Sequence, residues 1–201
     1  RQESIQAFQE SALDQLESDL PDLKVPDLQQ IWQDLGDDFF LRHTTPEIVS
    51  LSKKLLEHGD NASAFVSLSA PQTAASDEGA TKIYVLDQDR PKTFASLVVT
   101  LSQLGLTIVD AYISKASHDR YFDMFTVLDE DGTEVSDPAL RQSIVDHVKA
   151  TLENPEPSTN GATQRVSRQL KELKMPASVS LAAQEDGLTA VLNVTASDRP
   201  G

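Results

Sequence analysis

The sequence contains no cysteine, so disulfide bonds and thiol chemistry are excluded. Only one tryptophan occurs among the 201 residues, and aromatic residues make up 5% of them. No stretch approaches the roughly 20 consecutive apolar residues that a membrane-spanning helix needs. We therefore expect a cytoplasmic protein that has no membrane partner.

Basic residues are also scarce, with 17 Lys and Arg against 32 Asp and Glu and a net charge of −15. Residues 1–60 carry 13 acids and 5 bases, whereas residues 154–201 carry five of each. Binding to nucleic-acid phosphates needs clustered Lys and Arg, so nucleic acid is not an expected partner. We interpret the one basic cluster as the solvated face of a short helix: Arg165, Arg168, Lys171 and Lys174.

Residues that could perform catalysis or hold a metal do not form a recognisable motif. The histidines lie far apart in the sequence and lack the spacing of metal ligands: His43, His58, His118 and His147. The run Asp129-Glu130-Asp131 leads into Gly132 and is interpreted as a turn. Because no Gly-rich phosphate loop or nucleophile motif is present either, we expect no catalytic residue, metal or cofactor in this chain.

A partial internal repeat is the most informative feature that is present. Residues 82–91 read Lys-Ile-Tyr-Val-Leu-Asp-Gln-Asp-Arg-Pro, and residues 190–201 read Ala-Val-Leu-Asn-Val-Thr-Ala-Ser-Asp-Arg-Pro-Gly. Both copies are alternating apolar strands that enter the same Asp-Arg-Pro turn. A helix is expected to follow near Thr93, whereas the second copy stops at Gly201. The pattern predicts one complete module and the opening of a second, in a piece of a longer protein.

The first 60 residues are expected to form helices that lead into this module. Apolar residues recur at helical spacing in residues 5–16. A second short helix is expected over residues 27–35, ending at Gly36. A third begins after Thr44 or Thr45, with Pro46 in its first turn and Glu47 placed for a capping box.

The order of elements in residues 82–153 predicts a ferredoxin-like α+β unit. Strand 82–88 is followed by a helix over residues 92–104, with Phe94, Leu97 and Leu101 facing inward and Gly105 at its C-cap. Strands 107–113 and 121–129 come next, and a helix over residues 138–152 ends the unit. Strand, helix, two hairpin-linked strands and helix are most of that fold.

The missing fourth strand is expected at the start of the unit. Residues 65–70 resemble residues 178–183, and each precedes an Asp-Arg-Pro strand. We predict a permuted order, in which this strand pairs antiparallel with the next one. The alternative assigns residues 177–183 to the first unit as its ordinary fourth strand. The expected domains are a helical segment 1–60, a first unit 61–153, a linker with a short helix 154–176, and a truncated second unit 177–201.

The Asp-x-Pro turn, the helix after it and Ile108-Val109-Asp110-Ala111 on the next strand resemble the ACT domain, a small-molecule sensing module. A second segment indicates which family of ACT-containing proteins the chain resembles. It spans residues 31–48 and includes Trp32, Leu35-Gly36 and Phe40-Leu41-Arg42-His43. It is similar to the segment that joins the HD domain to tandem ACT domains in the PII uridylyltransferase family. Residues 121–132 also resemble a strand of the first ACT domain in that family.

This resemblance implies a parent enzyme that transfers UMP from UTP to the PII signalling protein and removes it in a separate HD domain. It further implies that L-glutamine is the effector, that Mg²⁺ serves the parent enzyme, and that this fragment has no active site. An alternative is a non-enzymatic ACT module that binds another amino acid or acts by dimerising. A homodimer that forms through the ACT strands is one assembly that the resemblance allows.

The resemblance also places a candidate effector site between the turn after the first strand and the second strand of a paired domain. It comprises Asp89, Arg90, Pro91, Lys92, Val109, Asp110 and Ala111 in the first unit, and Asp198, Arg199, Pro200 and Gly201 in the second. Lys92 stands where glycine is usual. Simpler roles remain open, since Asp89 could cap the following helix and Asp110 could be a protective charge on an edge strand.

Overall fold

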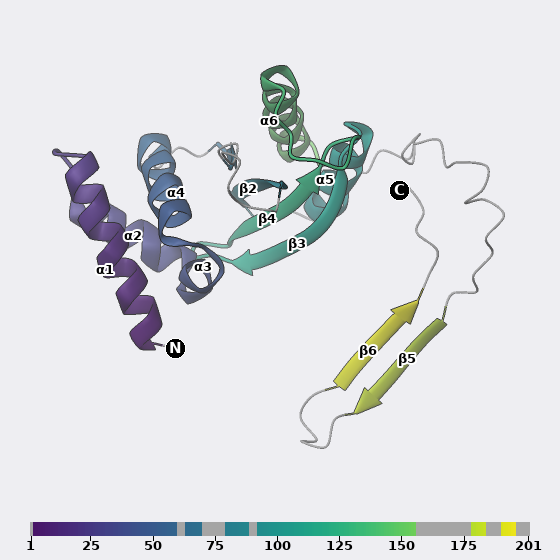
Figure 1. The fold of residues 1–201 in the computed structure, drawn as a ribbon, viewed down its shortest axis with the longest axis horizontal. Coiled ribbons are helices and arrows are strands. Elements are labelled where there is room, and N and C mark those ends of the chain that lie inside the picture. Colours follow the sequence, from purple (N-terminus) through teal and green to yellow (C-terminus); the bar gives the residue numbers. More distant parts are fainter. Residues whose placement is uncertain are drawn as a thin grey trace. The chain divides into compact units, whose positions relative to one another are not determined.

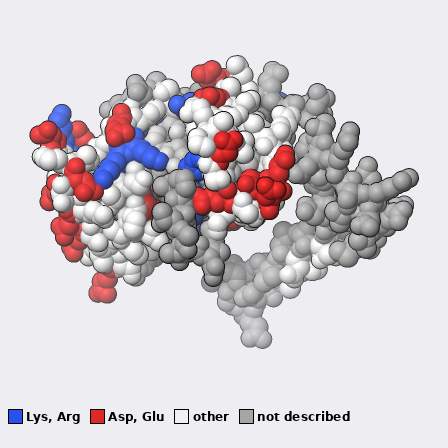
Figure 2. Space-filling model, turned by 45° about the horizontal axis from the view of Figure 1, so that its top comes forward, with Lys and Arg blue, Asp and Glu red and all other residues white. Residues whose placement is uncertain are grey.

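The computed structural model describes residues 2–59, 63–69, 79–88, 92–155, 178–183 and 190–195. The chain divides into two compact units, Arg1–Pro157 and Ser158–Gly201. The first contains four helices followed by an α+β module, and the second contains a strand pair (Figure 1). No helix within these stretches is long and apolar enough to cross a membrane. On the face drawn in Figure 2, acidic side chains are widely spread, and the fewer basic ones lie beside them.

Helices α1 (Gln2–Asp19), α2 (Val25–Leu35), α3 (Asp37–Arg42) and α4 (Thr45–His58) form the N-terminal part of the first unit. The predicted helix ends are confirmed at Gly36, which follows α2 with φ 77°, and at Thr44, which forms a capping box with Glu47 at the start of α4. Helix α3 was not predicted. Its six residues are too few to show a helical period, yet Phe39 and Phe40 are buried in the core.

The sheet of the first unit is antiparallel and has the strand order β1-β2-β4-β3. Its strands are β1 (Phe65–Leu68), β2 (Thr81–Gln88), β3 (Thr107–Lys115) and β4 (Arg120–Leu128), joined with helices α5 (Thr93–Gln103) and α6 (Pro138–Glu153). Strand β1 pairs with β2 in the register Phe65↔Leu86. This confirms the α+β, ferredoxin-like class and the permuted order, because β1 takes the place of the fourth strand beside β2.

The two faces of the sheet belong to two different hydrophobic clusters. Side chains of alternate residues point to opposite faces of a strand. On one face Ile83 and Phe125 pack with Leu97 of α5 and Ile144 of α6. On the other face Tyr84, Phe122 and Met124 join the core of α1–α4. The N-terminal helices therefore share a continuous core with the sheet.

Phe94 departs from the prediction, because it does not point into the core with Leu97 and Leu101. Its side chain is 41% exposed, whereas those two leucines are fully buried. The ring stacks on Phe125 with 5.7 Å between ring centroids. Helix α5 begins at Thr93, so Phe94 lies in the first turn of the helix.

The described part of the second unit is the antiparallel pair β5 (Ser178–Ala183) and β6 (Ala190–Thr195), in the register Ser178↔Thr195. This pair corresponds to β1 and β2 of the first unit, as the repeat predicts. Assigning residues 177–183 to the first sheet is wrong, since β2 already has β1 and β4 as neighbours. The basic cluster at residues 165–174 lies outside the described residues. The predicted domain limits stay a prediction.

Candidate functional site

The turn after β2 is described only at its last residue, Lys92, because Asp89, Arg90 and Pro91 lie outside the described residues. Lys92 has φ 72° and ψ −3°, a left-handed conformation, and is the N-cap of α5 without a side-chain capping bond. A glycine adopts this conformation without strain, which explains physically why glycine suits the position. In the second unit Asp198, Arg199, Pro200 and Gly201 also lie outside the described residues, so their predicted roles stay predictions.

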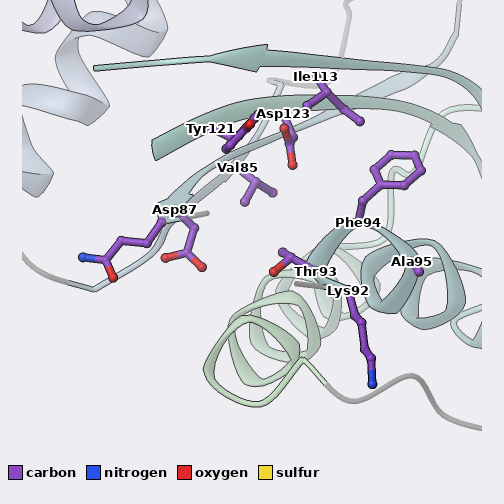
Figure 3. Close-up of a pocket in the computed structure, with 10 residues that line it drawn as sticks. Val85, Asp87, Lys92, Thr93, Phe94, Ala95, Ile113, Tyr121 and Asp123 are labelled. Carbon is purple, nitrogen blue, oxygen red and sulfur yellow. The ribbon is translucent and has the colours of Figure 1, made fainter. Parts of the chain in front are cut away.

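A cavity of about 430 Å³ lies between the first turn of α5 and the end of the sheet. Its volume is within the range of about 300–1,000 Å³ that is usual for small-molecule sites. Its wall is formed by side chains from α5 and from three strands (Figure 3): Val85, Asp87, Gln88, Lys92, Thr93, Phe94, Ala95, Ile113, Tyr121 and Asp123. The end of β2 and the start of α5, the elements that the predicted turn joins, both contribute to it.

Two aspartates in this wall were not predicted as site residues. Asp87 on β2 is 7% exposed and Asp123 on β4 is 6% exposed. The strand register places Asp123 opposite Val85, so Asp87 and Asp123 are near neighbours on the face that α5 covers. In the sequence, Asp87 and Asp123 alternate in step with the apolar residues Ile83, Val85 and Phe125, which indicates that they face the core. A charged residue at a core-facing position was the sequence signal that could have identified them as site residues.

The two carboxylates lack the partners that buried carboxylates usually have. Asp87 Oδ2 and Asp123 Oδ1 are both buried and accept no hydrogen bond from any described residue. Burial, together with the negative charge of Asp87, raises the pKa of Asp123 to about 6. In Figure 3 both carboxylates point into the space in front of Thr93, whereas the amino group of Lys92 points away from them.

The strand residues predicted for the site lie elsewhere. Val109, Asp110 and Ala111 are exposed on β3, which is the edge strand of the sheet. The pairing with β4 shifts between Ile108 and Asp110, so Val109 is the extra residue of a β-bulge. None of the three lines the cavity, which β3 reaches through Ile113. Within one chain the structure does not bring them together with Lys92, and their role across a paired domain stays a prediction.

The histidines have local partners in the described structure. His43 is buried, its Nδ1 lies 2.7 Å from the carbonyl oxygen of Phe39, and burial lowers its pKa. His147 contacts the carbonyl oxygen of Ser143 one turn earlier in α6. Across the described residues, no group of three or more His, Asp or Glu side chains is arranged to hold a metal ion. Asp129 forms the predicted turn, where its carboxylate accepts hydrogen bonds from the main chain of Asp131 and Thr133.

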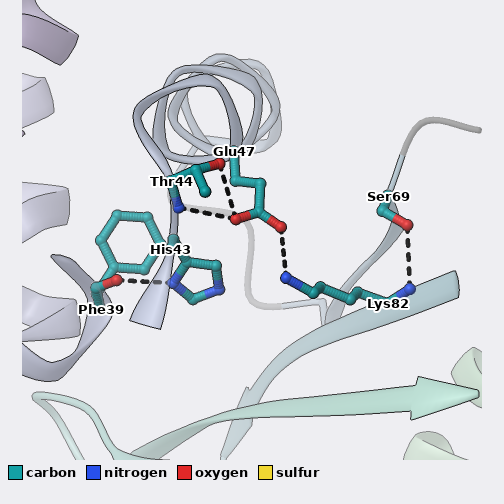
Figure 4. Close-up of polar contacts among 6 residues, drawn as sticks. All are labelled: Phe39, His43, Thr44, Glu47, Ser69 and Lys82. Carbon is teal, nitrogen blue, oxygen red and sulfur yellow. Dashed lines mark hydrogen bonds and ion pairs between the residues drawn. The ribbon is translucent and has the colours of Figure 1, made fainter. Parts of the chain in front are cut away.

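Strand β2 is attached to the N-terminal helices by a network around Glu47 (Figure 4). The Glu47 carboxylate accepts hydrogen bonds from the Thr44 main chain at 2.8 Å and from Lys82 Nζ at 2.6 Å. Burial alone would raise the pKa of Glu47, but the bonds from Lys82 and Thr44 outweigh it and the pKa is lowered. Lys82 lies on the same strand as Asp87, so the cavity is built on a strand that is tied to α4.

Strand β4 is attached in a similar way. Arg120 Nη2 contacts Asp34 Oδ2 of α2 at 3.3 Å, and the Ser117 main chain donates to the Asp34 carbonyl at 2.9 Å. On β3, the Tyr112 hydroxyl donates to Asp38 and the Arg42 guanidinium lies 3.6 Å from the Tyr112 ring centroid. The strands that carry Asp87, Ile113 and Asp123 are therefore all joined to the preceding helices.

The sequence of this chain is similar to those of known proteins. The family model described as "Uridylyltransferase GlnD fifth domain" matches residues 1–53. Over its whole length the chain is 36% identical to a bifunctional uridylyltransferase/uridylyl-removing enzyme of Pseudomonas putida and 34% identical to that of Stutzerimonas stutzeri. The enzyme of Acinetobacter baumannii is 30% identical over 87% of the chain.

The chain is related to one part of these bifunctional enzymes along its entire length. The resemblance found in residues 31–48 and 121–132 is thereby confirmed. The chain spans 22% of the length of the Pseudomonas putida and Stutzerimonas stutzeri enzymes and 20% of the Acinetobacter baumannii enzyme. No solved structure matches the chain.

Proposed function

We propose that this chain is the regulatory, C-terminal region of a bifunctional uridylyltransferase/uridylyl-removing enzyme and that it senses glutamine through an ACT domain. In this proposal the parent enzyme is cytoplasmic, uses Mg²⁺ to transfer UMP to the PII protein, and removes it in another domain. The fragment itself is catalytically silent. The relationship along the whole chain supports the proposal, and so does the ferredoxin-like strand order of the first unit.

The observation that carries glutamine sensing is the cavity of about 430 Å³ beside the β2–α5 turn. The turn is the element that the ACT resemblance assigns to the effector, and the cavity opens at the first turn of the helix that follows it. Main-chain N–H groups at a helix start attract a carboxylate, and free glutamine supplies one. Asp89, Arg90, Pro91 and Lys92 remain the proposed turn residues of this site.

A dimer-forming ACT module is the second candidate, and the edge strand β3 favours it. Val109 and Ile113 on this strand are 53% and 45% exposed, and an edge strand offers unpaired main-chain groups to another sheet. In such a dimer Val109, Asp110 and Ala111 would complete the effector site of the partner. This assembly is compatible with glutamine sensing, and sedimentation of the chain with and without glutamine tests it.

The test of the function is a thermal-unfolding screen of the 201-residue chain against the common amino acids, followed by calorimetric titration of those that stabilise it. A ligand that binds only the folded chain adds about 2.7 kcal/mol of stability at a hundredfold excess over its Kd. We expect glutamine to raise the unfolding temperature, with glutamate and asparagine as controls. Stabilisation by a different amino acid would make that amino acid the effector in place of glutamine. If no amino acid raised the unfolding temperature, the sensing function would be contradicted.

A further inference from the structure

We infer that the cavity under the first turn of α5 binds a primary ammonium group between the carboxylates of Asp87 and Asp123, and that the effector's α-ammonium is held there. The inference rests on the proposed function for the effector's identity, while the ammonium chemistry rests on the cavity wall. The inference places the effector's ammonium group on the face of the sheet beneath the β2–α5 turn, and not at the turn itself.

The two carboxylates need a cationic partner. Removing an unpaired carboxylate from water is costly, and buried carboxylates are normally paired or hydrogen-bonded. Asp87 and Asp123 are each more than nine-tenths buried and come from different strands, and the Asp87 Oδ2 and Asp123 Oδ1 atoms accept no hydrogen bond from a described residue. A primary ammonium has three N–H donors and a positive charge, so it can bond to both carboxylates at once.

The described residues around the cavity do not supply that cation. The charged or titratable groups that line it are Asp87 from β2, Asp123 and Tyr121 from β4, and Lys92 at the N-cap of α5, while β3 contributes only Ile113. The Lys92 amino group points away from the carboxylates (Figure 3). Among the described residues that line the cavity, none therefore neutralises the two carboxylates.

The geometry suits an amino acid with no net charge. Its ammonium would lie at the sheet face with Asp87 and Asp123, and its carboxylate would face the N–H groups of the first turn of α5, on the opposite wall. A second negative charge, as in glutamate, would be repelled by the carboxylate pair. The same pair makes binding sensitive to pH, because protonation of Asp123 near pH 6 removes half of the negative charge. Affinity is expected to fall as pH falls through that value.

The test is calorimetric titration of glutamine into the 201-residue chain and into the variants Asp87→Asn and Asp123→Asn. Asparagine keeps the volume and removes the charge, so both variants are expected to fold. Each should bind glutamine at least about tenfold more weakly, because a hydrogen bond to a charged group is lost. Asp131→Asn, in an exposed turn, is the matched control and should bind like the parent chain. Unchanged affinity in both Asp87→Asn and Asp123→Asn would overturn the inference while leaving glutamine sensing intact.

Two ligand probes test the inference without any variant. N-acetylglutamine lacks the ammonium and is expected not to compete with glutamine, so binding of comparable strength would contradict the ammonium site. If the parent chain does not bind glutamine, the proposed function fails, and methylammonium chloride followed by carbon NMR of the aspartate carboxyl groups decides the inference alone. Saturable shifts at Asp87 and Asp123, absent from Asp131, support it. No shift at either one overturns it.

Discussion

The two faces of the first sheet treat charged residues in opposite ways, even on the same strands. Towards α1–α4, Lys82 of β2 pairs with Glu47 at 2.6 Å and Arg120 of β4 pairs with Asp34 at 3.3 Å. Towards α5, Asp87 of β2 and Asp123 of β4 are buried beside a cavity with unpartnered oxygens. On the first face the charged side chains hold the helices to the sheet, whereas on the second two carboxylates lie at a cavity without a described hydrogen-bond partner for these oxygens.

A large-to-small substitution on the face of the sheet towards α1–α4 is expected to have the largest effect on stability. Phe122 is 2% exposed and lies against Phe39 of α3, with 5.8 Å between ring centroids. Phe122→Ala should reduce the free energy of unfolding by about 3–5 kcal/mol, because a large cavity opens where the helices meet the sheet. Urea unfolding followed by the fluorescence of Trp32 measures it. Phe94→Ala, at a 41% exposed phenylalanine on the other side, is the control and should cost much less.

Removing the charge of Asp123, on the face of the sheet towards α5, should stabilise the chain. The pKa of the Asp123 carboxyl is about 6 in the folded chain and 3.8 in its ordinary state, so ionisation within the fold costs free energy. Stability is therefore lost as pH rises from about 4 to 6, and the cost is complete above that range. Asp123→Asn removes it and should add about 1–3 kcal/mol at pH 8.

The pH profile of this gain distinguishes it from ordinary repacking. Below about pH 4 the carboxyl is protonated in both the folded and unfolded states, so Asp123→Asn should have almost no effect there. Urea midpoints from pH 3.5 to 8, with Asp131→Asn as the control, provide the measurement. A gain that is equal at all pH values would mean that the charge of Asp123 is not the cause. Together with weaker glutamine binding, a gain confined to high pH would mark Asp123 as a binding residue that costs stability.

Removing the Lys82–Glu47 pair should weaken the attachment of α4 to β2 by a smaller amount. Lys82→Met keeps the apolar stem and removes the charge, and we expect a loss of about 1–2 kcal/mol at neutral pH. The lowered pKa of Glu47 means that its contribution is present at neutral pH and is lost as pH falls below its ordinary value of 4.5. The difference between variant and parent should therefore shrink in acid. The partly exposed pair Lys53–Asp19, broken by Lys53→Met, is the control.

Much of this fold was predictable because its signals are local or repeated. The helix start at Thr44 follows from a capping box, and the position of β1 beside β2 follows from the repeat with residues 178–183. Helix α3 was missed because six residues do not reveal a helical period. Asp87 and Asp123 were missed for another reason. Each strand's alternation shows which side an aspartate faces, but only the register between β2 and β4 brings the two carboxylates together.

The smallest expected effect concerns the turn that leads into the cavity. Lys92 is exposed and holds φ at 72°, a conformation that costs a residue with a side chain about 1 kcal/mol. Lys92→Gly removes that cost but adds freedom to the unfolded chain, so we expect a net gain of about 0.5 kcal/mol. Lys92→Ala loses the same amino group without relieving the backbone and should give no gain. Equal unfolding midpoints for the two variants would show that the side chain, not the left-handed backbone, decides stability at this turn. A gain with glycine alone would show that the first unit keeps the backbone of a glycine turn despite its lysine.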